Sequence, residues 1–184
     1  MNAQCSSLSM NILMLDLEGV LIWSALYSAQ LKPWREERLE FLRRECGWPD
    51  DFFPSHNNIR PYAREFLSGC NELFDRVWMN TRVDETRTAA IMTGWFAFPN
   101  YRYWPPRGGC KTVGYGQFAG DTLVHVEDGV SLVEREEISR LGMHFVPVSS
   151  YHPLRIPESP SLEEALYSIR SIIDSAASSR EGRS

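Results

Sequence analysis

The sequence is poor in features that mark several classes of protein. Its 184 residues contain 4 cysteines, which are far apart and form no CxxC pair, and the 4 histidines have no metal-ligand spacing. Neither a disulfide framework nor a zinc site is therefore indicated. No stretch approaches the ~20 apolar residues of a membrane helix, and residues 1–10 lack the basic start of a secretory signal. We expect a cytoplasmic protein with reduced thiols and no membrane partner.

Basic residues are outnumbered by acidic ones, 19 to 24. The net charge of −5 and the pI near 5.4 argue against an extended nucleic-acid surface, so a phosphate-bearing partner should be small or locally bound. The apolar fraction of 43% is sufficient for one domain with its own core. We expect this domain over residues 11–174, with residues 1–10 and 175–184 as flexible termini.

Short apolar runs alternate with amphipathic segments along this domain. This pattern predicts an α/β fold, a three-layer sandwich with a mainly parallel central sheet, whose ligands bind at the carboxyl ends of the strands. Prolines and glycines predict a long loop up to Lys111, and residues 22–58 are expected to form a small cap or lid with one helix near Pro33. The predicted strands are residues 11–16, 77–79, 122–126 and 144–148; the predicted helices begin at Pro61, Asp84, Ser131 and Ser161.

Polar residues follow three of the predicted strands at the point where each strand ends. Asp16 and Glu18 follow the first strand and precede a glycine, Asn80–Thr81 follow the second, and Glu127–Asp128 follow the third. The ends of parallel strands meet at one edge of a sheet, so these groups should converge. Carboxylates gathered in this way suit a hard cation, and we expect Glu127 and Asp128 to complete a Mg²⁺ site with Asp16.

The same groups suit phosphoryl transfer. A carboxylate held beside Mg²⁺ can attack phosphorus, a role that fits Asp16, and Glu18 could protonate the leaving oxygen and then activate water. Donors for the phosphoryl oxygens would come from Asn80 or Thr81 and from Lys111, which is one of only two lysines in the chain.

In order along the chain, these motifs resemble the four motifs of the haloacid dehalogenase (HAD) superfamily of phosphatases. The resemblance covers about residues 11–150 and rests on Asp16-x-Glu18-Gly19-Val20, Asn80-Thr81, Lys111 and Glu127-Asp128. It implies a Rossmann-type fold and Mg²⁺ as cofactor, with Asp16 as nucleophile and metal ligand. It also implies that Glu18 is the general acid/base and gives its backbone carbonyl to the metal.

A second set of residues resembles one branch of that superfamily. Arg60-Pro61, Glu65-Phe66-Leu67 and Leu73-Phe74 are similar to the small-capped branch related to the RNA polymerase carboxy-terminal-domain phosphatases, and to uncharacterised bacterial HAD proteins. We therefore expect a Mg²⁺-dependent phosphatase that hydrolyses a phosphomonoester through an aspartyl-phosphate on Asp16. Its substrate would be a phosphorylated small molecule or an exposed phosphoresidue on a larger partner.

Two alternatives remain. A catalytically silent HAD scaffold that binds a partner or a phosphorylated ligand is suggested by Glu18, Asn80 and Glu127, which stand where the superfamily usually has other residues. A signalling receiver domain also combines an acceptor Asp with a Thr, a Lys and an acid pair. Receivers place the acid pair after the first strand, whereas here the pair comes late. The sequence leaves the oligomeric state open.

Overall fold

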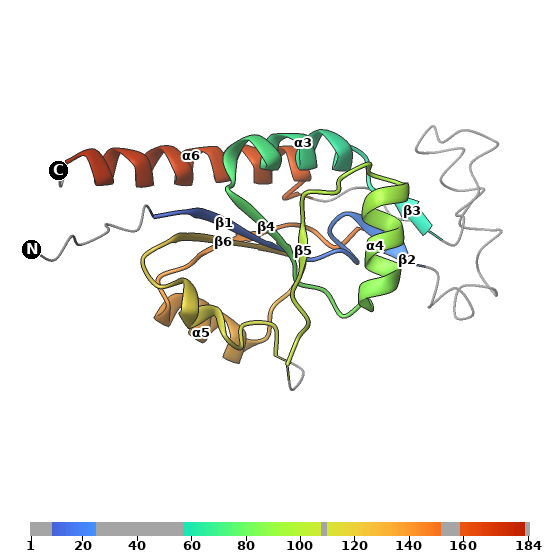
Figure 1. Ribbon diagram of the computed structural model, residues 1–184, viewed down its shortest axis with the longest axis horizontal. Helices are drawn as coiled ribbons and strands as arrows, with labels where there is room; N and C mark the ends of the chain where they lie inside the picture. The colour runs from blue at the N-terminus through green and yellow to red at the C-terminus, as the bar shows by residue number, and fades with distance from the viewer. Residues whose placement is uncertain (1–8, 25–56, 108–109, 152–158, 183–184) are drawn as a thin grey trace, which may run out of the picture.

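The computed structural model describes residues 9–24, 57–107, 110–151 and 159–182 (Figure 1). The elements are β1 (Asn11–Leu15), β2 (Ile22–Ser24), β3 (Asn57–Ile59), α3 (Ala63–Leu73), β4 (Arg76–Met79), α4 (Glu85–Gly94), β5 (Arg102–Tyr103), the 3-10 helix η2 (Tyr115–Phe118), β6 (Thr122–Glu127), α5 (Leu132–Arg140), β7 (His144–Pro147) and α6 (Leu162–Glu181). Among these residues no helix is both long and apolar enough to cross a bilayer.

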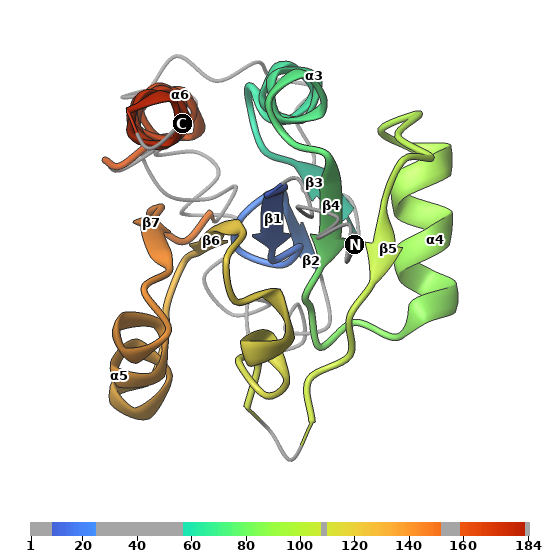
Figure 2. The ribbon, with the colours of Figure 1, turned by 60° about the vertical axis from the view of Figure 1, so that its left-hand side comes forward.

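A parallel sheet of five strands forms the middle layer, in the order β5-β4-β1-β6-β7. Helices α3 and α6 pack side by side over one face, and α5 lies on the opposite face (Figures 1 and 2). Helix α4 lies beside the edge strand β5 (Figure 2). The predicted α/β sandwich with a parallel sheet is therefore confirmed.

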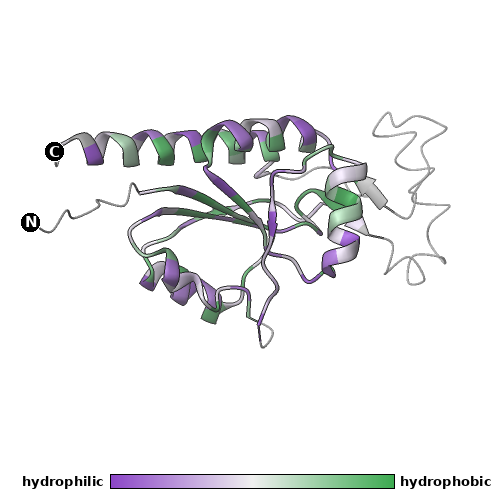
Figure 3. Ribbon diagram, in the orientation of Figure 1, coloured by the Kyte–Doolittle hydropathy of each residue, from purple (hydrophilic) through white to green (hydrophobic). Residues whose placement is uncertain are grey.

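The central strand β1 carries apolar side chains on both faces. Leu13 and Leu15 belong to a hydrophobic core that includes the inner sides of α3 and α6, whereas Ile12 and Met14 belong to a second core that contains Trp104. This double burial explains why the strand reads as an unbroken apolar run. Hydrophilic and hydrophobic residues alternate along α6, as expected for an amphipathic helix (Figure 3).

Three predicted helix starts are confirmed. The Asp84 side chain accepts a hydrogen bond from the backbone N–H of Arg87 at the start of α4. Capping boxes begin both α5, through Ser131 and Glu134, and α6, through Ser161 and Glu164. In each box the serine hydroxyl and the glutamate carboxylate satisfy backbone N–H groups that the helix leaves unpaired.

The loop predicted before Lys111 contains a strand that the sequence pattern misses. Strand β5 pairs with β4 through Trp78 with Arg102 and Met79 with Tyr103. Two residues are too few for a period-2 pattern to be visible, and prolines and glycines on both sides favour a loop reading. The sheet therefore has one edge strand more than predicted.

Helix α6 is longer than the apolar pattern indicates. It continues through Ser175 to Glu181, although apolar periodicity ends near Ile173. Arg180 near its end donates hydrogen bonds to Ser9 O at 3.3 Å and to Thr122 Oγ1 at 2.6 Å, so a polar contact holds the last turns against the start of the sheet.

Most of the predicted lid lies outside the described residues. Within residues 22–58, the structure describes β2 and the first part of β3, which pair antiparallel as a two-stranded sheet directly after the Glu18–Gly19 turn. The helix predicted near Pro33 falls within residues 25–56, which are outside the described ranges.

Candidate active site

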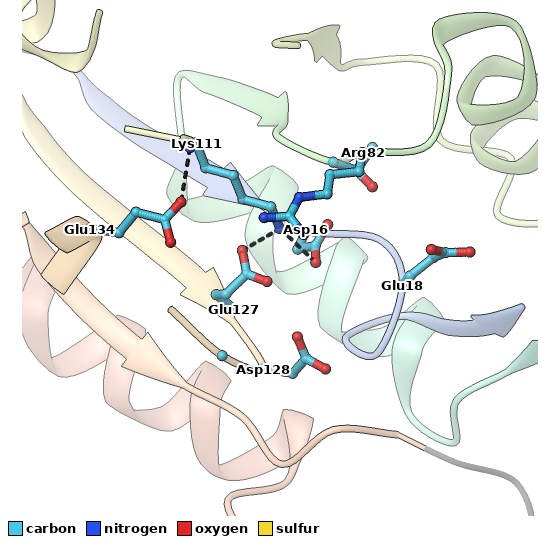
Figure 4. Close-up of a pocket in the computed structure, with 9 residues that line it drawn as sticks. Asp16, Glu18, Arg82, Lys111, Glu127, Asp128 and Glu134 are labelled. Carbon is cyan, nitrogen blue, oxygen red and sulfur yellow. Dashed lines mark hydrogen bonds and ion pairs between the residues drawn. The ribbon is translucent and has the colours of Figure 1, made fainter. Parts of the chain in front are cut away.

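A polar cavity of about 390 Å³ lies at the carboxyl ends of β1, β4 and β6 (Figure 4). Backbone hydrogen bonds align the three strand ends: Asp16 N donates to Val126 O at 3.1 Å, and Asn80 N donates to Leu15 O at 2.8 Å. The residues that line the cavity are Asp16, Glu18, Thr81, Arg82, Lys111, Glu127, Asp128, Gly129 and Glu134. The structure thus brings together all of the predicted site residues except Asn80 as lining groups.

A buried charge cluster forms the floor of this cavity. Lys111 Nζ lies 2.8 Å from Asp16 Oδ2 and 2.6 Å from Glu127 Oε2, so one ammonium bridges two carboxylates. All three side chains are buried. Buried charges are costly unless they are paired, and here two negative charges meet one positive charge. The cluster is therefore short of one positive charge.

The pKa shifts follow from this imbalance. Burial, followed by the nearby Glu127 carboxylate, raises the pKa of Asp16 from 3.8 to about 7. Burial likewise raises the pKa of Glu127. Burial alone would lower the pKa of Lys111, but the two carboxylates outweigh it and the pKa is raised. The lysine is thus held charged, and a proton or a bound cation would balance the remaining negative charge of the cluster.

The donor set fits a divalent cation. Carboxylate oxygens of Asp16, Glu127 and Asp128 lie within 4.8 Å of one another, and Asp16 Oδ1 is buried without a hydrogen-bond partner among the described residues. All-oxygen donors of this kind suit Mg²⁺. These residues therefore fit the cation predicted from the sequence.

Gly19 makes room for one of these ligands. Its φ is +78°, and a Cβ built on it would lie 2.0 Å from Asp128 Oδ2. A side chain at this position would thus be strained and would collide with the Asp128 carboxylate. The glycine after Glu18 is explained by the late acid pair, which lies more than a hundred residues further along the chain.

Two side chains from other elements hold the backbone of Lys111. Glu134 Oε1 accepts a hydrogen bond from Lys111 N at 2.9 Å, while Oε2 of the same carboxylate serves the capping box of α5. Asn80 Nδ2 donates to Lys111 O at 2.9 Å and also contacts the hydroxyl of Tyr115. The lysine loop is therefore fixed between the end of β4 and the start of α5.

These contacts give Asn80 and Thr81 different positions. From the sequence, either of them could donate to the phosphoryl oxygens. Asn80 is fully buried and its amide nitrogen is engaged by the Lys111 loop, so it is not a lining residue. Thr81 lines the cavity, and its Oγ1 accepts a hydrogen bond from Val83 N at 3.3 Å. The Thr81 hydroxyl remains able to donate.

Glu18 lies in the same cavity but apart from the acidic cluster. Its carboxylate points away from Asp16 in Figure 4, and it is not one of the three acids whose oxygens lie within 4.8 Å of one another. Its Oε1 is buried and has no hydrogen-bond partner in the described part of the chain. The second carboxylate is therefore separate from the metal-binding group, as an acid/base residue would be.

Arg60 fastens the turn that carries Glu18. Its guanidinium donates to Ser149 O at 2.9 Å, to Val20 O at 3.3 Å and to Gly19 O at 3.4 Å. Tyr151 N also donates to Gly19 O, at 2.7 Å. The Arg60-Pro61 pair that the sequence marked as a family feature thus ties the first loop of the site to the loop after β7.

Three lining residues, Arg82, Gly129 and Glu134, were not predicted to belong to the site. Arg82 directly follows Asn80–Thr81, and this position at a strand end was the available signal. Glu134 was recognised only as half of a capping box, because the contact of its second oxygen with the Lys111 loop has no local signature.

His125 is fully buried, and its Nε2 lies 3.4 Å from Glu127 Oε2. Burial lowers the pKa of His125 to about 4, so it is a neutral packed residue.

Comparisons with known proteins give matches in three-dimensional structure only. No family model matches the chain, and no curated protein sequence matches it. A haloacid dehalogenase-like hydrolase from Streptococcus pneumoniae is 12% identical, with 85% of this chain and 90% of that chain covered and a TM-score of 0.44. A HAD-superfamily hydrolase from Ehrlichia chaffeensis is 10% identical, with 91% and 100% covered and a TM-score of 0.49. The function proposed below rests on the site itself.

Proposed function

We propose that this chain is a Mg²⁺-dependent phosphatase of the HAD type that hydrolyses a phosphomonoester through an aspartyl-phosphate on Asp16. The supporting observation is the buried Asp16–Lys111–Glu127 cluster, which lacks one positive charge and leaves Asp16 Oδ1 without a hydrogen-bond partner beside the cavity. Bound Mg²⁺ would be held by Asp16, Glu127 and Asp128, with the Glu18 backbone carbonyl implied by the resemblance, and would stabilise negative charge on the phosphoryl oxygens.

The reaction balances with the groups present. A carboxylate oxygen of Asp16 attacks phosphorus, the bond to the leaving oxygen breaks, and Glu18 gives that oxygen its proton. Glu18 then takes a proton from water, which attacks the aspartyl-phosphate and releases inorganic phosphate. Thr81 and Lys111 donate to the phosphoryl oxygens, while Asn80 holds the Lys111 loop. Glu18 must turn from the orientation in Figure 4 for these steps.

We also propose that residues 22–58 form a lid that limits access of water and substrate. Strand β2 begins this segment directly beside the site, since Gly19 N donates to Ile22 O at 2.8 Å. The substrate would be a phosphorylated small molecule or an exposed phosphoresidue. The widely spaced cysteines favour a cytoplasmic location.

The decisive experiment is release of phosphate from an aryl phosphate in the presence of Mg²⁺. The wild-type protein should turn over, EDTA should abolish turnover, and Asp16→Asn should lower it by at least about 10⁴-fold because the nucleophile is lost. Asp75→Asn is the matched control, because Asp75 lies at the opposite end of the sheet and should leave turnover unchanged. Absence of phosphate release across a broad panel of phosphomonoesters would exclude the enzyme.

A silent phosphate-binding scaffold is the second candidate. It is favoured by Asn80, which stands at the usual phosphate-binding position yet is turned to Lys111 O and the Tyr115 hydroxyl. A scaffold would bind Mg²⁺ and inorganic phosphate without turnover. Calorimetric binding together with the aryl phosphate assay separates the two candidates.

A further inference from the structure

Arg82 is a cationic residue at the cavity whose role the reaction above does not use. It follows Thr81 in the loop between β4 and α4, it is exposed, and it lines the cavity. In Figure 4 its guanidinium extends toward Asp16 from the side opposite Glu134. A solvent-accessible arginine is thus directed at the position where the phosphoryl group would react.

The charges around the cavity show why a second cation is needed. Lys111 and Arg82 are the two basic residues among the lining groups, against the five acids Asp16, Glu18, Glu127, Asp128 and Glu134. Lys111 Nζ is already held by two carboxylates at 2.8 and 2.6 Å, so its charge is shared before any substrate enters. An incoming phosphate dianion would meet excess negative charge on this wall, even with one divalent cation bound.

Arginine suits this task better than a second lysine would. Its planar guanidinium presents several N–H donors in a fixed fork that matches two oxygens of one phosphate. Resting on the phosphatase function proposed above, we propose that Arg82 binds the peripheral oxygens of the transferred phosphoryl group. This adds a substrate-binding residue supplied by the loop after β4, opposite Lys111.

The proposal predicts opposite changes in two affinities. Calorimetry with inorganic phosphate in saturating Mg²⁺ should show binding that is about 10- to 100-fold weaker in Arg82→Gln, with Arg82→Lys in between. Calorimetry with Mg²⁺ alone should show affinity in Arg82→Gln equal to or greater than in the wild type, because a positive charge near the carboxylates has been removed. A merely structural role would weaken both. Arg170→Gln, an exposed arginine of α6, is the matched control and should change neither affinity.

Three results would overturn the role of Arg82: unchanged phosphate affinity in Arg82→Gln, joint loss of Mg²⁺ and phosphate binding, or no binding of millimolar phosphate by the wild type. The assignment can also be separated from the phosphatase function. Wild-type protein that binds phosphate through Arg82 but releases none from an aryl phosphate would exclude the enzyme and keep this residue's role. If Arg82→Gln turns over the aryl phosphate with unchanged kcat and KM, the phosphatase function is kept and the role of Arg82 is excluded.

Discussion

Two polar cavities of similar size in the described part of the chain lie at opposite ends of the sheet, and they differ in whether their charged side chains are buried. The cavity of about 390 Å³ at the carboxyl ends has a floor of buried Asp16, Lys111 and Glu127. The cavity of about 370 Å³ at the amino ends of β4 and β5 has three charged lining residues, Asp75, Arg76 and Arg102, and none of these three is buried.

This difference shows that volume and polarity alone do not identify a site. Charges exposed to water cost little, whereas the buried cluster is unfavourable unless a ligand completes it. Asp16 Oδ1 and Glu18 Oε1 are buried without hydrogen-bond partners, and no such atom lines the amino-end cavity within the described ranges. An unsatisfied buried charge is thus the property that separates the two ends of the sheet.

The largest effect is expected from removing the central ammonium. In Lys111→Met two buried carboxylates face each other, which should lower the free energy of unfolding by about 3–5 kcal/mol in metal-free buffer at pH 8. Arg76→Met in the other cavity should change it by less than about 0.5 kcal/mol. Urea unfolding of both variants measures the contrast. Equal effects would mean that the two cavities are energetically alike.

Asp16 should make stability depend on pH in the absence of metal. The pKa of Asp16 is raised from 3.8 to about 7, so the native state binds more protons than the unfolded state between those values. Stability should therefore fall as pH rises from about 4 to 7, by up to about 4 kcal/mol. The measurement is the difference in unfolding free energy between wild type and Asp16→Asn across this range in EDTA.

Mg²⁺ is the control for this pH effect. A bound cation supplies the missing positive charge, so saturating Mg²⁺ should remove the excess loss of stability of the wild type at pH 7. A difference between wild type and Asp16→Asn that stays constant with pH in EDTA would contradict the charge imbalance at this end of the sheet.

A methyl group added at Gly19, in the loop after β1, should have a smaller effect on stability than the changes at Lys111 and Asp16. In Gly19→Ala the new Cβ would displace the Asp128 carboxylate, which should weaken Mg²⁺ binding by about 10-fold or more. Gly142→Ala is the matched control, since it has a φ of +66° but open space around a built Cβ. Both variants should lose about 1–2 kcal/mol of stability from backbone strain. Titration with Mg²⁺ separates them, and equal Mg²⁺ affinities would exclude the steric role of Gly19.

The smallest change in stability is expected from substitutions in the two capping boxes, which have the same Ser-x-x-Glu pattern. Glu134→Gln and Glu164→Gln should each cost about 1 kcal/mol of helix stability. The Glu134 carboxylate also accepts from Lys111 N, so only Glu134→Gln should lower turnover, by about 10-fold. Steady-state kinetics with thermal unfolding tests this, and a matching loss of turnover in Glu164→Gln would show that helix stability alone is responsible.

Local sequence patterns account for most of the fold. The apolar run of β1, the Asp84 cap and the two Ser-x-x-Glu boxes depend on neighbours within a few residues, and each was found at its predicted place. Strand β5 and the last turns of α6 depend on partners far along the chain, through Trp78 and Thr122 respectively. The pattern could not reveal them for that reason.

The sequence by itself determined which chemistry is available: acids after the first and third predicted strands, polar donors after the second, and a lysine in the loop between. Because parallel strands end at one edge, it also determined that these groups would meet. Only the tertiary structure decided that Asn80 supports the lysine loop while Thr81 faces the cavity, and that Arg82 points inward. Side-chain direction and burial depend on packing between distant elements, which no local pattern encodes.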